Sequence, residues 1–227
     1  MKFRWELAVG IVGIAALLFG HGMGLFYAPP ERMMGEVGRI FYVHVPVAWY
    51  AMLTFTVAAV AAVGWLTTGR HGFDWCVEAA TEVGIVLNAL LLILGSLWAR
   101  PTWGVWWTWD PRLTSATVML LTFVGVMLLR SAFKDPLRRA NRTAIATILA
   151  FVNVPVTYMS VKWWRSLHQI QSTPDTVSEP MVLVFRINLV AMLLVVVWFI
   201  AHRWRIAKTR AAAERPPELP PRIAETS

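Results

Sequence analysis

The feature that most constrains this chain is a series of six long apolar stretches, free of charged residues except for Arg186 in the sixth. They cover residues 7–27, 46–69, 83–99, 113–129, 143–161 and 181–201. A helix needs about 20 mostly apolar residues to cross a hydrocarbon core about 30 Å thick. The sequence therefore predicts an all-α integral membrane protein with six transmembrane helices.

The composition excludes a soluble globule, because only 15% of the residues are charged and 57% are hydrophobic, whereas soluble domains are about 25% charged. The first stretch follows Lys2 and Arg4, as a signal peptide would, but it is too long and lacks a small-residue cleavage motif. We expect it to remain as the first helix. The single cysteine, Cys76, excludes a disulfide framework and a covalent CxxCH haem attachment.

The distribution of Lys and Arg predicts the orientation, since cytoplasmic segments retain positive charge. With a cytoplasmic N-terminus, fourteen Lys and Arg residues fall on the inner side and six on the outer side. Both termini are then cytoplasmic. We expect a membrane domain over 1–206 and a Pro-rich, disordered cytoplasmic tail over 207–227. The net charge of +8 is explained by topology, so no nucleic-acid binding is expected.

Tryptophans gather on the predicted outer side, which holds eight of the 13: Trp49, Trp98, Trp103, Trp106, Trp107, Trp109, Trp163 and Trp164. Trp103, Trp106 and Trp107 have the spacing of one helix face, and Trp109 follows them. The cluster fits either an interfacial aromatic belt or a platform for a flat ligand. A belt would place tryptophans on both sides of the membrane.

Two histidines fall on the same side. His44 ends a run of apolar residues at helical spacing that begins at Met33, which predicts a short surface helix. His168 shares a predicted helix face with Trp164 and Gln171. Two neutral imidazoles on opposite faces of a haem give six-coordinate iron. The alternative for His44 is an interfacial histidine bonded to a carbonyl, and the alternative for the pair is coincidence, since His71 and His202 fall on the cytoplasmic side.

Charged and polar residues near these clusters have two readings each. Asp110 and Pro111 are typical of a helix N-cap and first turn. Arg100 and Arg112 would pair with a carboxylate ligand such as haem propionates, or hold Asp110 in place. Arg186 lies within the sixth stretch and needs a partner or a wet cavity. Three asparagines near mid-depth are typical of interhelical hydrogen bonds: Asn88, Asn153 and Asn188.

The segment WGVWWTWDPRLTS, with YVHVPVAW before it and WWRSLHQ after it, closely resembles the WWD signature of haem-handling membrane proteins of cytochrome c maturation. Among these, a six-span chain with two outer histidines is similar to the CcmC family over residues 5–205. The resemblance implies a WWD loop over 100–113 and a haem site in periplasmic loops. It places the haem platform on Trp103, Trp106, Trp107, Trp109 and Asp110, and the axial iron ligands on His44 and His168.

The resemblance also implies a function. Haem b, bound non-covalently as cargo, would be held at the outer face of the bacterial inner membrane and delivered to the periplasmic haem chaperone CcmE. CcmA, CcmB and CcmD would be the other subunits of the complex, and this chain would not be an enzyme. The sequence contains no GxxxxGK[ST] phosphate loop, so an ATP-driven step would come from a partner.

Two other functions fit parts of the pattern. A b-type electron-transfer cytochrome also uses two histidines, but it predicts ligands at mid-membrane on facing helices. A small-solute transporter would line its route with Arg186 and the asparagines.

Overall fold

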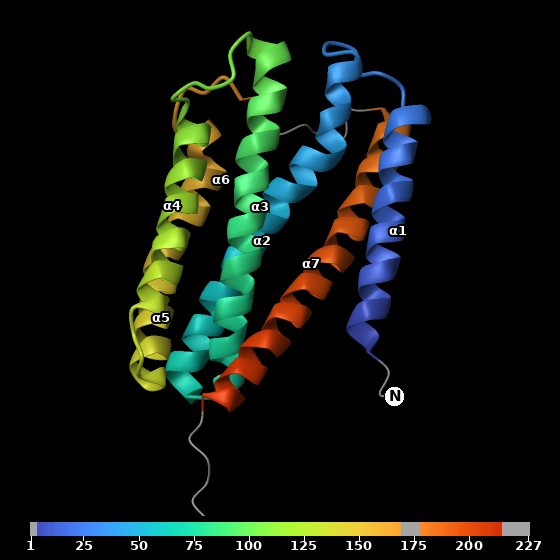
Figure 1. Ribbon diagram of the computed structural model, residues 1–227. Helices are drawn as coiled ribbons and strands as arrows, with labels where there is room; N and C mark the ends of the chain where they lie inside the picture. The colour runs from blue at the N-terminus through green and yellow to red at the C-terminus, as the bar shows by residue number, and fades with distance from the viewer. Residues whose placement is uncertain (1–3, 169–177, 215–227) are drawn as a thin grey trace, which may run out of the picture.

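The computed structural model describes residues 4–168 and 178–214, which form a helical bundle without β-strands (Figure 1). In chain order the elements are α1 (Trp5–Phe26), the 3-10 helix η1 (Glu36–Ile40), α2 (Phe41–Thr68), α3 (His71–Trp103), α4 (Pro111–Ser131), α5 (Pro136–Phe151), α6 (Asn153–Trp163) and α7 (Glu179–Ala213). Six spans in this part of the chain are long and apolar enough to cross a membrane, with α5 and α6 together making one. The prediction of an all-α protein with six transmembrane helices is confirmed.

Helix ends follow local chemistry. Asp110 caps α4 by accepting a hydrogen bond from the Arg112 backbone N–H at 2.9 Å, with Pro111 as the first helical residue. This confirms the predicted N-cap. At the other end of the bundle, α2 stops at Gly69, whose φ of 66° suits glycine.

The fifth span is broken at Val152, a break that the uncharged stretch 143–161 did not predict. Pro155 explains it, because proline has no N–H to donate and its ring clashes with the carbonyl four residues earlier. The Asn153 side chain donates to the Ala150 carbonyl at 3.1 Å. Asn153 therefore satisfies backbone at the kink.

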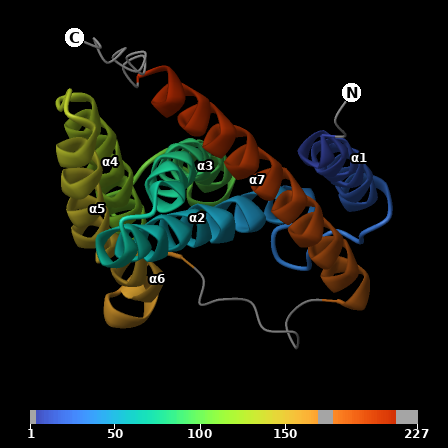
Figure 2. The same ribbon diagram turned by 90° about the horizontal axis from the view of Figure 1, so that it is seen from below.

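The bundle has three parts, seen along its axis in Figure 2. α4, α5 and α6 form one side, α1 and α7 form the other, and α2 with α3 lies between them. α1 contacts mainly α7 among the described elements. The two ends of the bundle are called here the tryptophan end, which holds Trp98–Asp110, and the terminal end, which holds Arg4 and Ala213 (Figure 1).

Close packing of α2 on α3 and α4 holds the centre together. The ring of Phe55 in α2 stacks on that of Phe123 in α4 with centroids 3.7 Å apart, and both side chains are fully buried. A Cβ added at Gly84 would lie 2.5 Å from the Phe55 ring, so only glycine allows this approach. Small residues at helix contacts are typical of membrane bundles, where backbones must approach closely to gain van der Waals contact.

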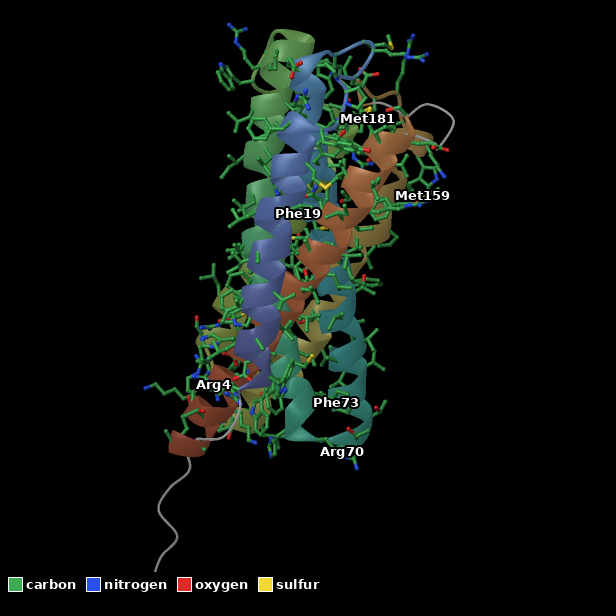
Figure 3. The ribbon with its side chains drawn as sticks, turned by 90° about the vertical axis from the view of Figure 1, so that its right-hand side faces the viewer. Arg4, Phe19, Arg70, Phe73, Met159 and Met181 are labelled. Carbon is green, nitrogen blue, oxygen red and sulfur yellow. The ribbon has the colours of Figure 1, made fainter. Side chains whose placement is uncertain are left out.

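The terminal end is rich in buried charge. Arg130 of α4 donates to Asp74 and Glu78 of α3, with both closest contacts at 2.7 Å. Figure 3 shows Arg4 and Arg70 at this same end, opposite Met181. α7 continues to Ala213, so the helix extends beyond the expected boundary at residue 206, and the tail residues 215–227 lie outside the described part.

The glycine at position 84 gives a stability test. Gly84→Ala should lower the thermal unfolding midpoint of the purified protein, because overpacking a core costs about 1–3 kcal/mol. Gly125→Ala is the matched control, since a Cβ there meets nothing within 4 Å. It should leave the midpoint unchanged or raise it, because alanine is favoured over glycine in a helix by about 0.5–1 kcal/mol. Equal midpoints for the two variants would contradict this account.

Candidate functional site

His44 lies in the first turn of α2, at the tryptophan end. It was expected at the end of a surface helix, but only the short η1 forms and α2 begins at Phe41, because helical structure continues through Pro46. The His44 ring is buried and lies edge-on to Trp98, with centroids 5.3 Å apart. Its Nδ1 has no hydrogen-bond partner among the described residues.

The spacing of Trp103, Trp106 and Trp107 suggested one helix face, but the structure does not form a helix through all three. α3 ends at Trp103, and Gly104 follows with φ of 78°, a conformation that favours glycine. The chain then folds back, because Ser96 Oγ donates to the Trp106 carbonyl at 2.9 Å. Within the expected loop 100–113, residues 104–110 are therefore the non-helical part.

The four platform candidates lie differently in this segment. Trp106 and Trp109 are exposed, by 56% and 78%, while Trp103 and Trp107 are partly buried. The Trp107 and Trp109 rings meet edge to face at 5.7 Å. Arg100 lies 6.0 Å from the Trp106 ring and donates to the Gly104 carbonyl, so both of these contacts are within the segment.

Asp110 connects two segments that are far apart in sequence. Besides capping α4, its carboxylate accepts from Ser166 Oγ at 3.0 Å and from the Leu167 backbone N–H at 2.7 Å. Burial raises the pKa of Asp110, but these hydrogen bonds together lower the pKa below its usual range. The buried carboxylate therefore stays ionised and anchors the segment that carries His168.

His168 lies beyond the end of α6, in a segment that is not helical up to this residue. The expected helix face through Trp164 is wrong, because α6 ends at Trp163 and Trp164 has extended backbone angles. Gln171, the other member of that face, lies outside the described residues. The His168 ring lies edge-on to Trp103, with centroids 5.0 Å apart.

The imidazole of His168 is neutral at pH 7. Burial, followed by the charge of Arg112, lowers its pKa to about 4, against the opposing charge of Asp110. Its Nδ1 is 3.6 Å from an Asp110 oxygen, too long for a hydrogen bond, and has no partner in the described part of the chain. A neutral imidazole without a hydrogen bond on this nitrogen is free to act as a ligand.

The structure brings the predicted site residues to one end of the bundle. His44 is within electrostatic range of His168 and Arg112, and Asp110 links the latter two. The Arg112 guanidinium makes no hydrogen bond or ion pair with another described residue. Arg186 does not join this group. It is exposed on α7 and makes no hydrogen bond or ion pair with another residue in the described part of the chain.

Sequence reasoning missed three residues that support the site. Ser166 contacts Asp110, and Gly95 makes room for His44, whose Cε1 would be 3.4 Å from an added Cβ. Arg39 donates to the carbonyls of Ala28, at 2.9 Å, and Gly24, which ties α1 to the segment entering α2. The position of Arg39 five residues before His44 was the one available signal.

Fold and site together define a multi-pass membrane protein that presents two histidines and a tryptophan-rich segment at one end. Comparison with known proteins identifies the family, since residues 2–216 match the profile of CcmC, described as Heme exporter protein C. The chain belongs to the CcmC family. This description is of a transport protein, not of an enzyme.

Curated relatives carry the same description, Heme exporter protein C. The protein of Bradyrhizobium diazoefficiens is 36% identical over 73% of this chain and 61% of its own length. That of Escherichia coli K12 is 37% identical over 71% of this chain and 66% of its own. That of Haemophilus influenzae is 31% identical over 89% of this chain and 85% of its own length. The chain thus spans less than two thirds of the first two relatives.

The anchoring role of Asp110 can be tested without any ligand. Asp110→Ala should speed tryptic cleavage after the exposed Arg165 about tenfold or more, because each hydrogen bond to a charged group contributes about 1.5–3 kcal/mol. Asp110→Asn, which remains a good N-cap, should have an intermediate effect. Peptide mass spectrometry over time measures the rate. Unchanged cleavage in Asp110→Ala would show that the segment is held by other contacts.

Proposed function

We propose that this chain binds haem at the tryptophan end and passes it to a periplasmic haem chaperone during the maturation of c-type cytochromes. The observation that carries the proposal is the pair His44 and His168, each packed edge-on against a tryptophan and each with a buried Nδ1 that has no partner among the described residues. Buried polar atoms in native proteins are nearly always satisfied. Iron coordination would satisfy this pair.

The surrounding residues suit a porphyrin. Exposed indoles of Trp106 and Trp109 offer large flat apolar surfaces for its macrocycle, and Trp103 and Trp107 would complete that platform. The guanidinium of Arg112, which has no hydrogen bond or ion pair within residues 4–168 and 178–214, would bind a propionate, since arginine pairs bidentately with carboxylates. Asp110 acts as a positioning residue for His168, because its oxygens are already occupied by protein donors.

The relatives' description as haem exporters supports haem as the cargo. We assign the cargo as non-covalent haem b, because the only cysteine lies in α3 near the terminal end. The chaperone would be CcmE, and the chain would work with CcmA, CcmB and CcmD. The b-type cytochrome alternative is less well supported, because His44 lies at a helix end and His168 outside the helices.

The transporter alternative is less well supported, because two of the asparagines expected to line its route make contacts within or between helices. Asn88 donates to the Ala116 carbonyl at 3.1 Å and so joins α3 to α4. Asn188 bonds its own helix and packs against Gly20 of α1.

Haem binding gives the direct test. His44→Ala and His168→Ala should each lower the haem retained per purified chain roughly tenfold or more, since even changes around metal ligands cost about 10–100-fold in affinity. The measurement is the haem absorption band at equal protein concentration. His71→Ala is the matched control, because His71 packs against tryptophans at the opposite end. Full haem retention in both site variants would overturn the proposal.

Delivery is tested by crosslinking the haem-loaded chain to purified CcmE. Haem should move to CcmE from the unaltered protein and not from His168→Ala. Retention of haem by the chain at excess CcmE would contradict delivery, and would leave haem binding itself standing.

We place the protein in the bacterial inner membrane, with the tryptophan end facing the periplasm. In a Cys76→Ser background, an impermeant maleimide should label Thr102→Cys from the periplasm and Thr67→Cys only after the membrane is opened. Both threonines are exposed, at opposite ends of the bundle. The reverse labelling pattern would invert the orientation.

A further inference from the structure

An open groove of about 470 Å³ lies at the terminal end, between the start of α1 and the last turns of α7. Its polar lining consists of Arg4, His202, Arg205, Thr209 and Arg210. Three guanidinium groups therefore face one space, and no described carboxylate lines it. The groove is at the opposite end from the haem-site candidates, so it is independent of the proposed function.

The nearby carboxylates are already engaged and leave positive charge over. Glu6 is 1% exposed and accepts from Arg4 at 3.1 Å and from Arg205, so two guanidinium groups share one carboxylate. Glu78 contacts both Arg130 and Arg210, but Arg130 also pairs with Asp74, so that group is balanced. The surplus positive charge near the groove therefore comes from the two arginines on Glu6.

A further observation points to a missing hydrogen-bond partner. His202 lines the groove, and its Nδ1 is buried without a hydrogen bond to any described residue. A buried polar atom without a partner is costly. It is the kind of group that a bound ligand or its water shell would satisfy.

The depth of the groove matches that of lipid headgroups. Tryptophan prefers the membrane interface, and two tryptophans mark that level here: Trp5, half exposed at the start of α1, and Trp204, which donates to the Gly72 carbonyl at 3.0 Å. α7 has 35 residues and is therefore about 52 Å long, which exceeds a hydrocarbon core of about 30 Å. Its last turns, with Arg205 and Arg210, extend into the headgroup layer.

We propose that this groove binds the phosphate group of an anionic phospholipid, with Arg4, Arg205 and Arg210 as the donors. Arginine forms short, charge-assisted hydrogen bonds with phosphate oxygens. Basic sites between helix ends at a membrane surface are suited to acidic headgroups. The apolar lining of Ile206 and Ala213 would contact the glycerol and the first acyl carbons. A soluble phosphate has no apolar group that could contact this apolar surface.

The test adds a negative charge to the groove without removing an existing side-chain contact between elements. Thr209 lines the groove, and its hydroxyl bonds only the Arg205 carbonyl of its own helix. The full chain is reconstituted in nanodiscs with equal amounts of phosphatidylglycerol and phosphatidylcholine, then extracted mildly. Native mass spectrometry counts the retained lipids of each class.

The unaltered chain should retain more phosphatidylglycerol than phosphatidylcholine. Thr209→Glu should reduce that enrichment about fivefold, because one charge near a membrane surface is worth about 1 kcal/mol. Thr209→Gln, which matches glutamate in size, should keep the enrichment. Thr67→Glu should keep it too, since it adds the same charge at the same end but outside the groove.

If Thr209→Glu fails to fold, as judged by circular dichroism, Ala213→Glu and Ala213→Gln repeat the comparison at an exposed position of the groove. No enrichment in the unaltered chain, or equal enrichment in the Glu and Gln variants, would overturn the proposal. Soluble glycerol 3-phosphate provides the remaining arm. If it displaces phosphatidylglycerol at equal concentration, the groove is a site for soluble anions and the lipid assignment is wrong.

Discussion

Hydrocarbon offers no hydrogen-bond partner to a peptide group, and this constraint governs the rest of the structure. Every N–H and C=O in the membrane must be satisfied within the chain, which restricts the described spans to helices. Irregular backbone then survives only where a side chain compensates for it. Asn153 does so at the kink beside Pro155, and Asp110 does so where α4 begins. Polar side chains at these places are therefore part of the fold before they have any other role.

The same constraint separates the chemistry of the two ends. At the terminal end, charges are paired in compact groups, such as Arg130 with Asp74 and Glu78. Such groups are strongly destabilised when one partner is lost, because the other charge stays buried. At the tryptophan end, by contrast, the His168 imidazole is uncharged, and the Arg112 guanidinium has no hydrogen bond or ion pair with another described residue. The unsatisfied ligand atoms at the tryptophan end are suited to binding, whereas the Arg130 group at the terminal end joins α3 to α4 and leaves any binding there to the neighbouring groove.

The sequence predicted the spans well because their lengths follow from the absence of charge, and it predicted the α4 cap because Asp-Pro is a local signal. It failed where the answer depends on contacts distant along the chain. Nothing in the spacing of Trp164 and His168 reveals that Ser166 bonds Asp110, 56 residues earlier. Helical spacing alone suggested a helix there, and the carboxylate instead holds a non-helical segment. The helix break was missed because the apolar pattern of 143–161 outweighed Pro155.

Under the proposed function, the two histidines are supported in different ways. His44 is part of α2 and is packed against Trp98 of α3, so its position is as rigid as the central helix pair. His168 lies on a non-helical segment that is held to the bundle through the oxygens of Asp110. Contacts of that kind open at a lower free energy than a packed helix does. A haem bound by both would thus have one fixed ligand and one releasable ligand, and cargo that must be handed on needs the second as much as the first.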